Sequence, residues 1–570
     1  MRFRHVLPHF SVLTAVACRI WALEMMPLSY DRGYPLGLGI FIRDAVAAGR
    51  FSDLPWMSLL ASINLRNPAG ASWFWAAIST IDASPFVATV LVALLHAVVV
   101  TAVAHRIAAQ LFGEPVGIAA GLLAAGSPWA AWVARGPWLQ GTLEVFAALS
   151  AWLLFCGLHE NRPRRTFAGL LVIAGALHTY LAAFGLLAQT SIALLASLRT
   201  FTPSHTPSHT PSHANFTAAR KALALGTLTV VLSLAWIAGA FLAARGDVRA
   251  AVDNPNAINA DLKPGELNLD PIRHALRLTS GRDFENTFGD TAHLSWRDWF
   301  GDAQSTLLDL AILLGVLLTA ARARTDARMR FVLLWFVTPI ALTFIIGNFV
   351  MREWKVHVFY LTLASPMMYV LAAAPLQLLR TRTLRTSTAA LVLIAHSASV
   401  LANQASDIAV RHSDPAGVRA SEGITTGAAT RLGRILAARC ASVLSAENEV
   451  WLASWIGSSQ LTRPGALRAD NASGMALVEP AGHTCLVQNT PDAPLPYIFD
   501  REPITASRAP DAQPVIELEA VPQENVLYTV NLGWSLLQLD APAQAHPGDD
   551  VVIRHVWRID ALPPEEHAAW

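Results

Sequence analysis

The sequence predicts a mainly α-helical protein that crosses a membrane about eleven times and ends in a C-terminal extracytoplasmic α/β or β-sandwich region. Hydrophobic residues make up 53% of the 570 residues and charged residues 15%, with a mean hydropathy of +0.40. This composition excludes an ordinary soluble domain. The net charge of +1 gives no basic excess, so nucleic acid is not an expected partner.

Apolar runs of about 20 residues, the length that spans a bilayer, recur along the first 403 positions. The first run follows a basic N-terminus, and we interpret it as an uncleaved signal anchor. The eleven predicted spans are 8–28, 86–109, 116–134, 139–158, 167–182, 184–199, 222–244, 304–321, 331–348, 356–377 and 386–403.

The basic connections give the orientation of these spans. If the N-terminus is cytoplasmic, the arginine-rich connections at 162–165, 199–221, 322–330 and 380–385 all face the cytoplasm, as the positive-inside rule requires. Counting 167–199 as one span would move the later basic loops outside, so we expect two. The predicted location is the inner (plasma) membrane, with the C-terminal region outside the cytoplasm.

The same pattern predicts three regions, namely a transmembrane domain at 1–403, a mixed α/β region at 404–512 and a β-sandwich-like segment at 513–570. The transmembrane domain contains a first extracytoplasmic loop at 29–85, a cytoplasmic repeat linker at 200–220 and an extracytoplasmic loop at 245–303.

Local patterns predict elements within these regions. Apolar spacing in the first loop predicts two in-plane helices, one around Leu36 to Ala45 and one around Trp56 to Ile63. A helix is expected at 421–446. Strands are expected at 450–455, 476–478, 484–487, 515–520 and 534–539.

The stretch Ser29-Tyr30-Asp31-Arg32-Gly33-Tyr34 follows the first span and opens the long first loop. An acidic residue here is either a solvated helix end or a carboxylate held at the membrane surface for chemistry. Its residue type alone leaves both interpretations open.

Several short patterns further along resemble the GT-C glycosyltransferases, and among them the protein mannosyltransferase/aminoarabinose transferase type. The resemblance covers about residues 8–400 and departs from the family at Arg32, where glutamate is frequent, and at Asn67, where histidine is frequent. The patterns are Asp31 after the first span, in-plane helices, Asn67-Pro68 before aromatic residues, Leu111-Phe112-Gly113, residues 121–129 followed by Arg135 and Trp138, and His178-Thr179-Tyr180.

The resemblance implies a hexosyl- or pentosyltransferase that moves a sugar from a polyprenyl-phosphate donor to a protein, lipid or glycan acceptor on the extracytoplasmic side, with membrane lipid around it. It implies inversion, with Asp31 as general base, and no cofactor; a divalent metal is possible but not indicated. The residues expected to bind the donor phosphate are Arg135, Arg352, Lys355 and His357. Those expected to bind substrate are Tyr30, Tyr34, Asn67, Trp138, His178 and Tyr180.

The C-terminal segment is similar to the β-sandwich appended to some bacterial membrane glycosyltransferases, in which a Pro-Gly-Asp turn precedes a strand ending in Trp-Arg, here Trp557-Arg558. Further strands follow in such sandwiches, so a truncated or smaller version is expected.

Two other classes remain open. One is a transporter or flippase of lipid-linked glycans, which should show inverted repeats and charges within its spans. The other is an inactive GT-C-like scaffold, which the departures at Arg32 and Asn67 favour. The absence of a repeat among the spans and the gathering of polar features on the outer side favour the enzyme.

Overall fold

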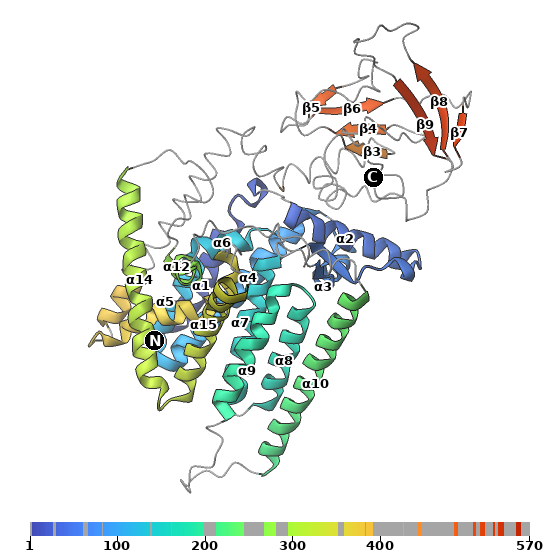
Figure 1. Ribbon diagram of the computed structural model, residues 1–570. Coiled ribbons are helices and arrows are strands. Elements are labelled where there is room, and N and C mark those ends of the chain that lie inside the picture. Colours follow the sequence, from blue (N-terminus) through green and yellow to red (C-terminus); the bar gives the residue numbers. More distant parts are fainter. Residues whose placement is uncertain are drawn as a thin grey trace.

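The computed structural model is a helical bundle with short strands towards its C-terminus (Figure 1). It describes residues 3–26, 30–60, 66–82, 84–136, 139–160, 162–198, 213–243, 267–280, 295–350, 358–381, 383–391, 426, 442–445, 484–487, 506–508, 514–518, 528–530, 534–540 and 554–559.

Helices account for nearly all of the described chain before residue 392. They are α1 (Phe3–Ile20), α2 (Tyr30–Ala47), α3 (Gly70–Ser79), α4 (Pro85–Phe112), α5 (Glu114–Gly126), α6 (Pro128–Ala134), α7 (Leu139–His159), α8 (Pro163–Leu177), α9 (Phe184–Leu198), α10 (His213–Ala243), α12 (Asp270–Ser280), α14 (Ser295–Ala323), α15 (Ala327–Ile345) and α16 (Ser365–Ala373). Short 3-10 or π segments are η1 (Leu23–Met25), η2 (Phe51–Asp53), η3 (Leu181–Ala183), η4 (Ile346–Val350), η5 (Val358–Ala364) and η6 (Ala374–Leu378).

Each predicted span contains a helix, although the last, at 386–403, is described only as far as residue 391. Within the described residues, six helices are long and apolar enough to cross a membrane, and the bent pair α5–α6 would be a seventh. The helices at Phe10–Ile20 and Leu181–Ala196 are apolar but shorter. The mainly helical membrane fold is therefore confirmed, and α8 and α9 are two helices, as the basic loops required.

The 56° bend between α5 and α6 follows from Gly126-Ser127-Pro128. A residue before proline is driven to extended backbone, and Ser127 has φ −65° and ψ 121°. Pro128 then occupies the first turn of α6, while the Ser127 hydroxyl accepts a hydrogen bond from the Ala130 amide at 3.3 Å. One helix ends here and the next begins in a new direction.

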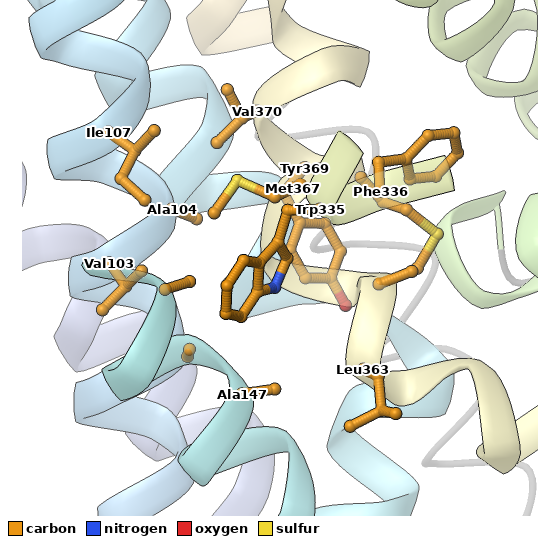
Figure 2. Packing of buried hydrophobic residues seen from close by; sticks show 14 of the residues in the cluster. Val103, Ala104, Ile107, Ala147, Trp335, Phe336, Leu363, Met367, Tyr369 and Val370 are labelled. Atoms are coloured by element: carbon orange, nitrogen blue, oxygen red, sulfur yellow. The ribbon is translucent and has the colours of Figure 1, made fainter. Parts of the chain in front are cut away.

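The core of the bundle is formed by α4, α5, α7, α15 and α16. Trp335 of α15 is fully buried, and its ring stacks on Phe331 with centroids 5.3 Å apart. Figure 2 shows Trp335 among Val103, Ala104 and Ile107 of α4 and residues of α16. The outer faces of α10 and α14 instead leave leucines exposed, as lipid-facing helices do.

The first loop contains a helix at one of the two expected places. The helix expected around Leu36 to Ala45 is confirmed as α2, which packs on α3. The helix expected from Trp56 is wrong, because Met57–Leu60 forms strand β1 and pairs antiparallel with β2 (Arg66–Pro68). Proline at both ends of this stretch (Pro55 and Pro68) shortens any helix, and pairing satisfies the backbone instead.

Two sheets lie in the C-terminal region. The four-stranded sheet has the order β3-β4-β6-β5, with β3 parallel to β4, and the three-stranded sheet β7-β8-β9 is antiparallel. The strands are β3 (Ser442–Ser445), β4 (Thr484–Val487), β5 (Ala506–Arg508), β6 (Pro514–Leu518), β7 (Tyr528–Val530), β8 (Trp534–Asp540) and β9 (Arg554–Ile559).

The strands expected at 484–487, 515–520 and 534–539 are confirmed as β4, β6 and β8. Strands expected at 450–455 and 476–478 lie outside the described residues. The helix expected at 421–446 is wrong at its end, where β3 pairs with β4. Because β6 pairs with β4 and β5, the four-stranded sheet takes strands from both sides of residue 512.

Candidate functional site

After α1 the chain bends at Trp21–Met26, ahead of α2 and Asp31. Ala22 has φ 50°, in the left-handed region that few non-glycine residues adopt, and η1 follows it. Leu23 and Met26 are 1% and 0% exposed and pack with Phe86 and Val90 of α4. We call Trp21–Met26 the exit bend.

Asp31 lies in the first turn of α2, between Tyr30 and Arg32, and Tyr34 follows one turn later. The amino end of a helix carries unpaired N–H groups and partial positive charge, so it favours negative charge. Three of the predicted site residues, Tyr30, Asp31 and Tyr34, therefore lie within the first five residues of α2.

Arg135, expected to bind donor phosphate, lies beside the exit bend. It follows the last residue of α6, is 2% exposed, and its Nη2 donates to the carbonyls of Trp21 at 2.8 Å and Ala22 at 3.3 Å. Thr426 lies at the other end of the bend, where its amide and hydroxyl donate to the Met26 carbonyl at 2.7 and 2.9 Å. Both contacts restrain the segment that leads to Asp31.

A second group of predicted residues meets where the first loop contacts the α8–α9 break. The Asn67 side chain is 1% exposed, and its Oδ1 accepts a hydrogen bond from the Leu181 amide at 3.1 Å. The Gly70 amide donates to the His178 carbonyl at 2.7 Å. Tyr180 is buried beside them at 6% exposure. Asn67, His178 and Tyr180, predicted separately as substrate residues, therefore lie together.

A cavity of about 350 Å³ opens at this junction. Its walls come from the first loop, the α8–α9 break and one face of α10, and its lining is mainly aromatic and aliphatic. The lining residues are Trp56, Met57, Pro68, Ala69, Gly70, Trp73, His178, Trp236, Ile237 and Ala240. We call this the tryptophan pocket.

Three tryptophans line the tryptophan pocket. The ring of Trp56 meets that of Trp236 edge-on, with centroids 5.0 Å apart, and lies 6.5 Å from that of Trp73. Trp56 and Trp236 are 52% and 56% exposed. Large, exposed aromatic surfaces beside a cavity are typical of a ligand-binding site.

The sequence did not single out Trp236, because a tryptophan near the end of a span is also typical of the membrane interface. It also missed Arg19, His96 and Glu144, which are fully buried inside the bundle. The expectation that polar features gather on the outer side is therefore wrong for these three. His96 and Glu144 stand within predicted spans, and an ionisable residue there is the signal that finds them.

The other predicted site residues, Trp138, Arg352, Lys355 and His357, lie outside the described residues. Within the described part of the chain, no group of three His, Cys, Asp or Glu side chains is placed to hold a metal ion.

Known proteins similar to this chain are membrane glycosyltransferases. Residues 66–208 match the family model of the dolichyl-phosphate-mannose-protein mannosyltransferases. The crystal structure of ArnT from Cupriavidus metallidurans in the apo state is similar, with a TM-score of 0.51 and 13% identity over 90% of this chain and 98% of that one. No curated protein sequence matches the chain.

Two further structures have lower scores. ArnT from Cupriavidus metallidurans bound to undecaprenyl phosphate has a TM-score of 0.47 and 14% identity, over 90% of this chain and 99% of that one. An Archaeoglobus fulgidus oligosaccharyltransferase tethered to an acceptor peptide has 0.40 and 11%, over 80% and 63%.

The apo ArnT likeness shows a shared fold. The mannosyltransferase match covers the first loop from residue 66 onward, α3 to α9, and the pocket residues Pro68, Ala69, Gly70 and Trp73 of the first-loop wall. Together they confirm the resemblance to GT-C membrane glycosyltransferases of the protein mannosyltransferase/aminoarabinose transferase type.

Proposed function

We propose that the protein is an integral membrane glycosyltransferase that moves a sugar from a polyprenyl-phosphate donor to an acceptor on the extracytoplasmic side, with inversion. The observation that supports the proposal is the place of Asp31 in the first turn of α2, five positions after the end of the restrained exit bend, in a chain similar in fold to ArnT. The orientation proposed is the one that the basic connections predict, with the N-terminus in the cytoplasm.

In this reaction Asp31 is the general base. It takes the proton of the acceptor hydroxyl while that oxygen bonds to the anomeric carbon of the sugar. The bond from the anomeric carbon to the phosphate oxygen breaks on the opposite face, and polyprenyl phosphate leaves with the bonding electrons. The helix end that favours negative charge at residue 31 supports the ionised carboxylate that a base requires.

The leaving phosphate gains charge, so cations must lie near it. We propose Arg352, Lys355 and His357 for this role. Arg135 is different, because its guanidinium already donates to the Trp21 and Ala22 carbonyls and is almost fully buried. We propose that Arg135 acts mainly by holding the exit bend.

For the tryptophan pocket we propose the apolar chain of the lipid-linked substrate. Its lining is largely apolar and its volume is that of a small-ligand site. Its residue Trp236 is more than half exposed and belongs to α10, whose outer face also exposes leucines. His178 is one of the lining residues, whereas Asn67 and Tyr180 are buried beside the junction and support it, Asn67 through its bond to the Leu181 amide.

Transfer of radiolabelled sugar from a panel of polyprenyl-phosphate sugars, in membranes that contain the protein, tests this proposal. We expect at least one donor to be used, Asp31→Asn to lose transfer, and EDTA to leave it unchanged. Asp44→Asn is the matched control, since Asp44 stands on the same helix, is part-exposed and pairs with Arg43 at 2.8 Å. Failure of every donor would instead favour a transporter or a scaffold.

A further inference from the structure

Three ionisable side chains form a closed network inside the bundle. Arg19 of α1, His96 of α4 and Glu144 of α7 are each 0% exposed. Arg19 Nε donates to His96 Nδ1 at 3.1 Å, and His96 Nε2 lies 2.9 Å from Glu144 Oε2. The other carboxylate oxygen, Oε1, accepts from the Ser365 hydroxyl of α16.

The bonds of this network fix its protonation. A guanidinium can only donate, so Nδ1 of His96 accepts and its proton is on Nε2, which donates to Glu144. The imidazole is therefore neutral and lies between one positive and one negative charge. Every member has a partner within the network, which is the condition for keeping charges in a low-dielectric interior.

Arg19 also donates hydrogen bonds to carbonyls at the break between α5 and α6. Pro128 has no N–H, so the Ala124 carbonyl loses its usual partner four residues on. Arg19 Nη2 donates to that carbonyl at 3.0 Å, and Nη1 donates to the Ala125 carbonyl at 2.9 Å. One side chain in the last turn of α1 is thus tied to α4, α5 and, through His96, to α7 and α16.

The exit bend begins two residues after Arg19. A slide or rotation of the last turn of α1 would break the bonds from Arg19 to His96, Ala124 and Ala125. Arg135 holds the start of the bend and Thr426 its end. Asp31 comes twelve positions after Arg19, and the bonds described restrain Arg19, Trp21, Ala22 and Met26.

We propose that Arg19, His96 and Glu144 are positioning residues that fix the exit bend and, through it, the first turn of α2 that carries Asp31. The proposal rests on the proposed function in taking Asp31 as the base. The three side chains are fully buried inside the bundle and absent from the lining of the tryptophan pocket, so their loss should lower kcat and leave the KM for the donor nearly unchanged.

A fully apolar replacement separates this role from a merely structural one. Removing one charged side chain leaves its partner's charge buried and unpaired, which destabilises the fold. Replacing a whole buried network by apolar residues of similar size is often neutral for stability. We therefore compare the native protein with Arg19→Met/His96→Leu/Glu144→Met. The control is Gln189→Met, which removes a buried side chain that links α9 to the Trp335 and Leu363 carbonyls, away from the exit bend.

The measurements are kcat, KM, the melting temperature and hydrogen exchange of the amides at 21–47. For the triple variant we expect a fall in melting temperature like that of Gln189→Met, because the Ala124 and Ala125 carbonyls lose the Arg19 donors. We expect kcat to be lower by about 100-fold, as a displacement of about 1 Å causes, and exchange at 21–47 to be faster by on the order of tenfold. Gln189→Met should lower the melting temperature and leave kcat and that exchange at native values.

A triple variant with native kcat and native exchange overturns the proposal. If the triple variant does not fold, Glu144→Gln decides, because an amide can still accept from His96 and meet Ser365. We expect near-native exchange at 21–47 in Glu144→Gln and faster exchange in Glu144→Ala, and equal exchange in the two overturns the proposal. Hydrogen exchange needs no substrate, so it tests this inference even if no donor is used and the proposed function fails.

Discussion

The contact between Gly70 and His178 is a place where one methyl group should disturb the site. A Cβ on Gly70 would lie 2.8 Å from the His178 carbonyl carbon and 2.9 Å from its Cβ, with the carbonyl oxygen nearer still. Non-bonded carbons are ordinarily about 3.5–4.0 Å apart. In Gly70→Ala, the start of α3 and the α8–α9 break must therefore separate by about 1 Å.

That separation has two costs. The hydrogen bond from the Gly70 amide to the His178 carbonyl, at 2.7 Å, lengthens beyond useful range, which costs about 1 kcal/mol. Overpacking against backbone adds about 1–3 kcal/mol. Because both residues line the tryptophan pocket, we expect Gly70→Ala to lower the melting temperature and to raise the KM for a polyprenyl-phosphate donor by about tenfold or more.

The assay is donor-dependent sugar transfer together with a thermal unfolding scan of the purified protein. Gly239→Ala is the control, since Gly239 lies on α10 beside the pocket residue Ala240 and a Cβ there meets nothing within 4 Å. Its KM should be native. A Gly70→Ala protein with native KM and native melting temperature would refute the close contact and the pocket built on it.

Three further substitutions test neighbouring parts of the account. Trp236→Ala removes the edge-on contact with Trp56, so the KM for long-chain donors should rise about tenfold and the KM for short-chain donors should rise less. Leu232→Ala, exposed on the same helix, is the control. An equal rise in KM for both chain lengths would contradict this. Asn67→Ala leaves the Leu181 amide without its acceptor and should cost about 1–3 kcal/mol of unfolding free energy, whereas Asn67→Asp should cost less. Arg135→Lys keeps the charge but loses the guanidinium hydrogen bonds to the Trp21 and Ala22 carbonyls, so the melting temperature and kcat should fall while the KM for the donor stays native. A raised KM with native kcat and melting temperature would instead make Arg135 a phosphate ligand.

The sequence predicts the helical part of the fold well, because apolar runs and arginine-rich connections are local and strong signals. The same is true of the break at His178 to Tyr180. The helix expected around Trp56 failed because β1 depends on a partner, Arg66–Pro68, that local spacing does not contain. Apolar spacing over a few residues does not separate a short in-plane helix from a short strand.

The site itself needed three-dimensional contacts. Trp56 and Trp236 are 180 positions apart, and only the packing of α10 against the first loop brings their rings together. Arg19, His96 and Glu144 come from three helices, and each alone reads as one polar residue in or near an apolar run. Asp31 stays a prediction: an acidic residue at the exit of a span is a local signal, and its role as base comes from the resemblance to GT-C glycosyltransferases.

The central claim is that Asp31 is the base of a sugar transfer from polyprenyl phosphate. The measurement that tests it most directly is turnover by purified native protein and Asp31→Asn in lipid nanodiscs, with sugar transferred and polyprenyl phosphate released counted together. We expect equal amounts of the two products from the native protein and turnover about 10²–10⁴-fold lower in Asp31→Asn, the usual effect of losing a general base. Native turnover in a folded Asp31→Asn protein would contradict the claim.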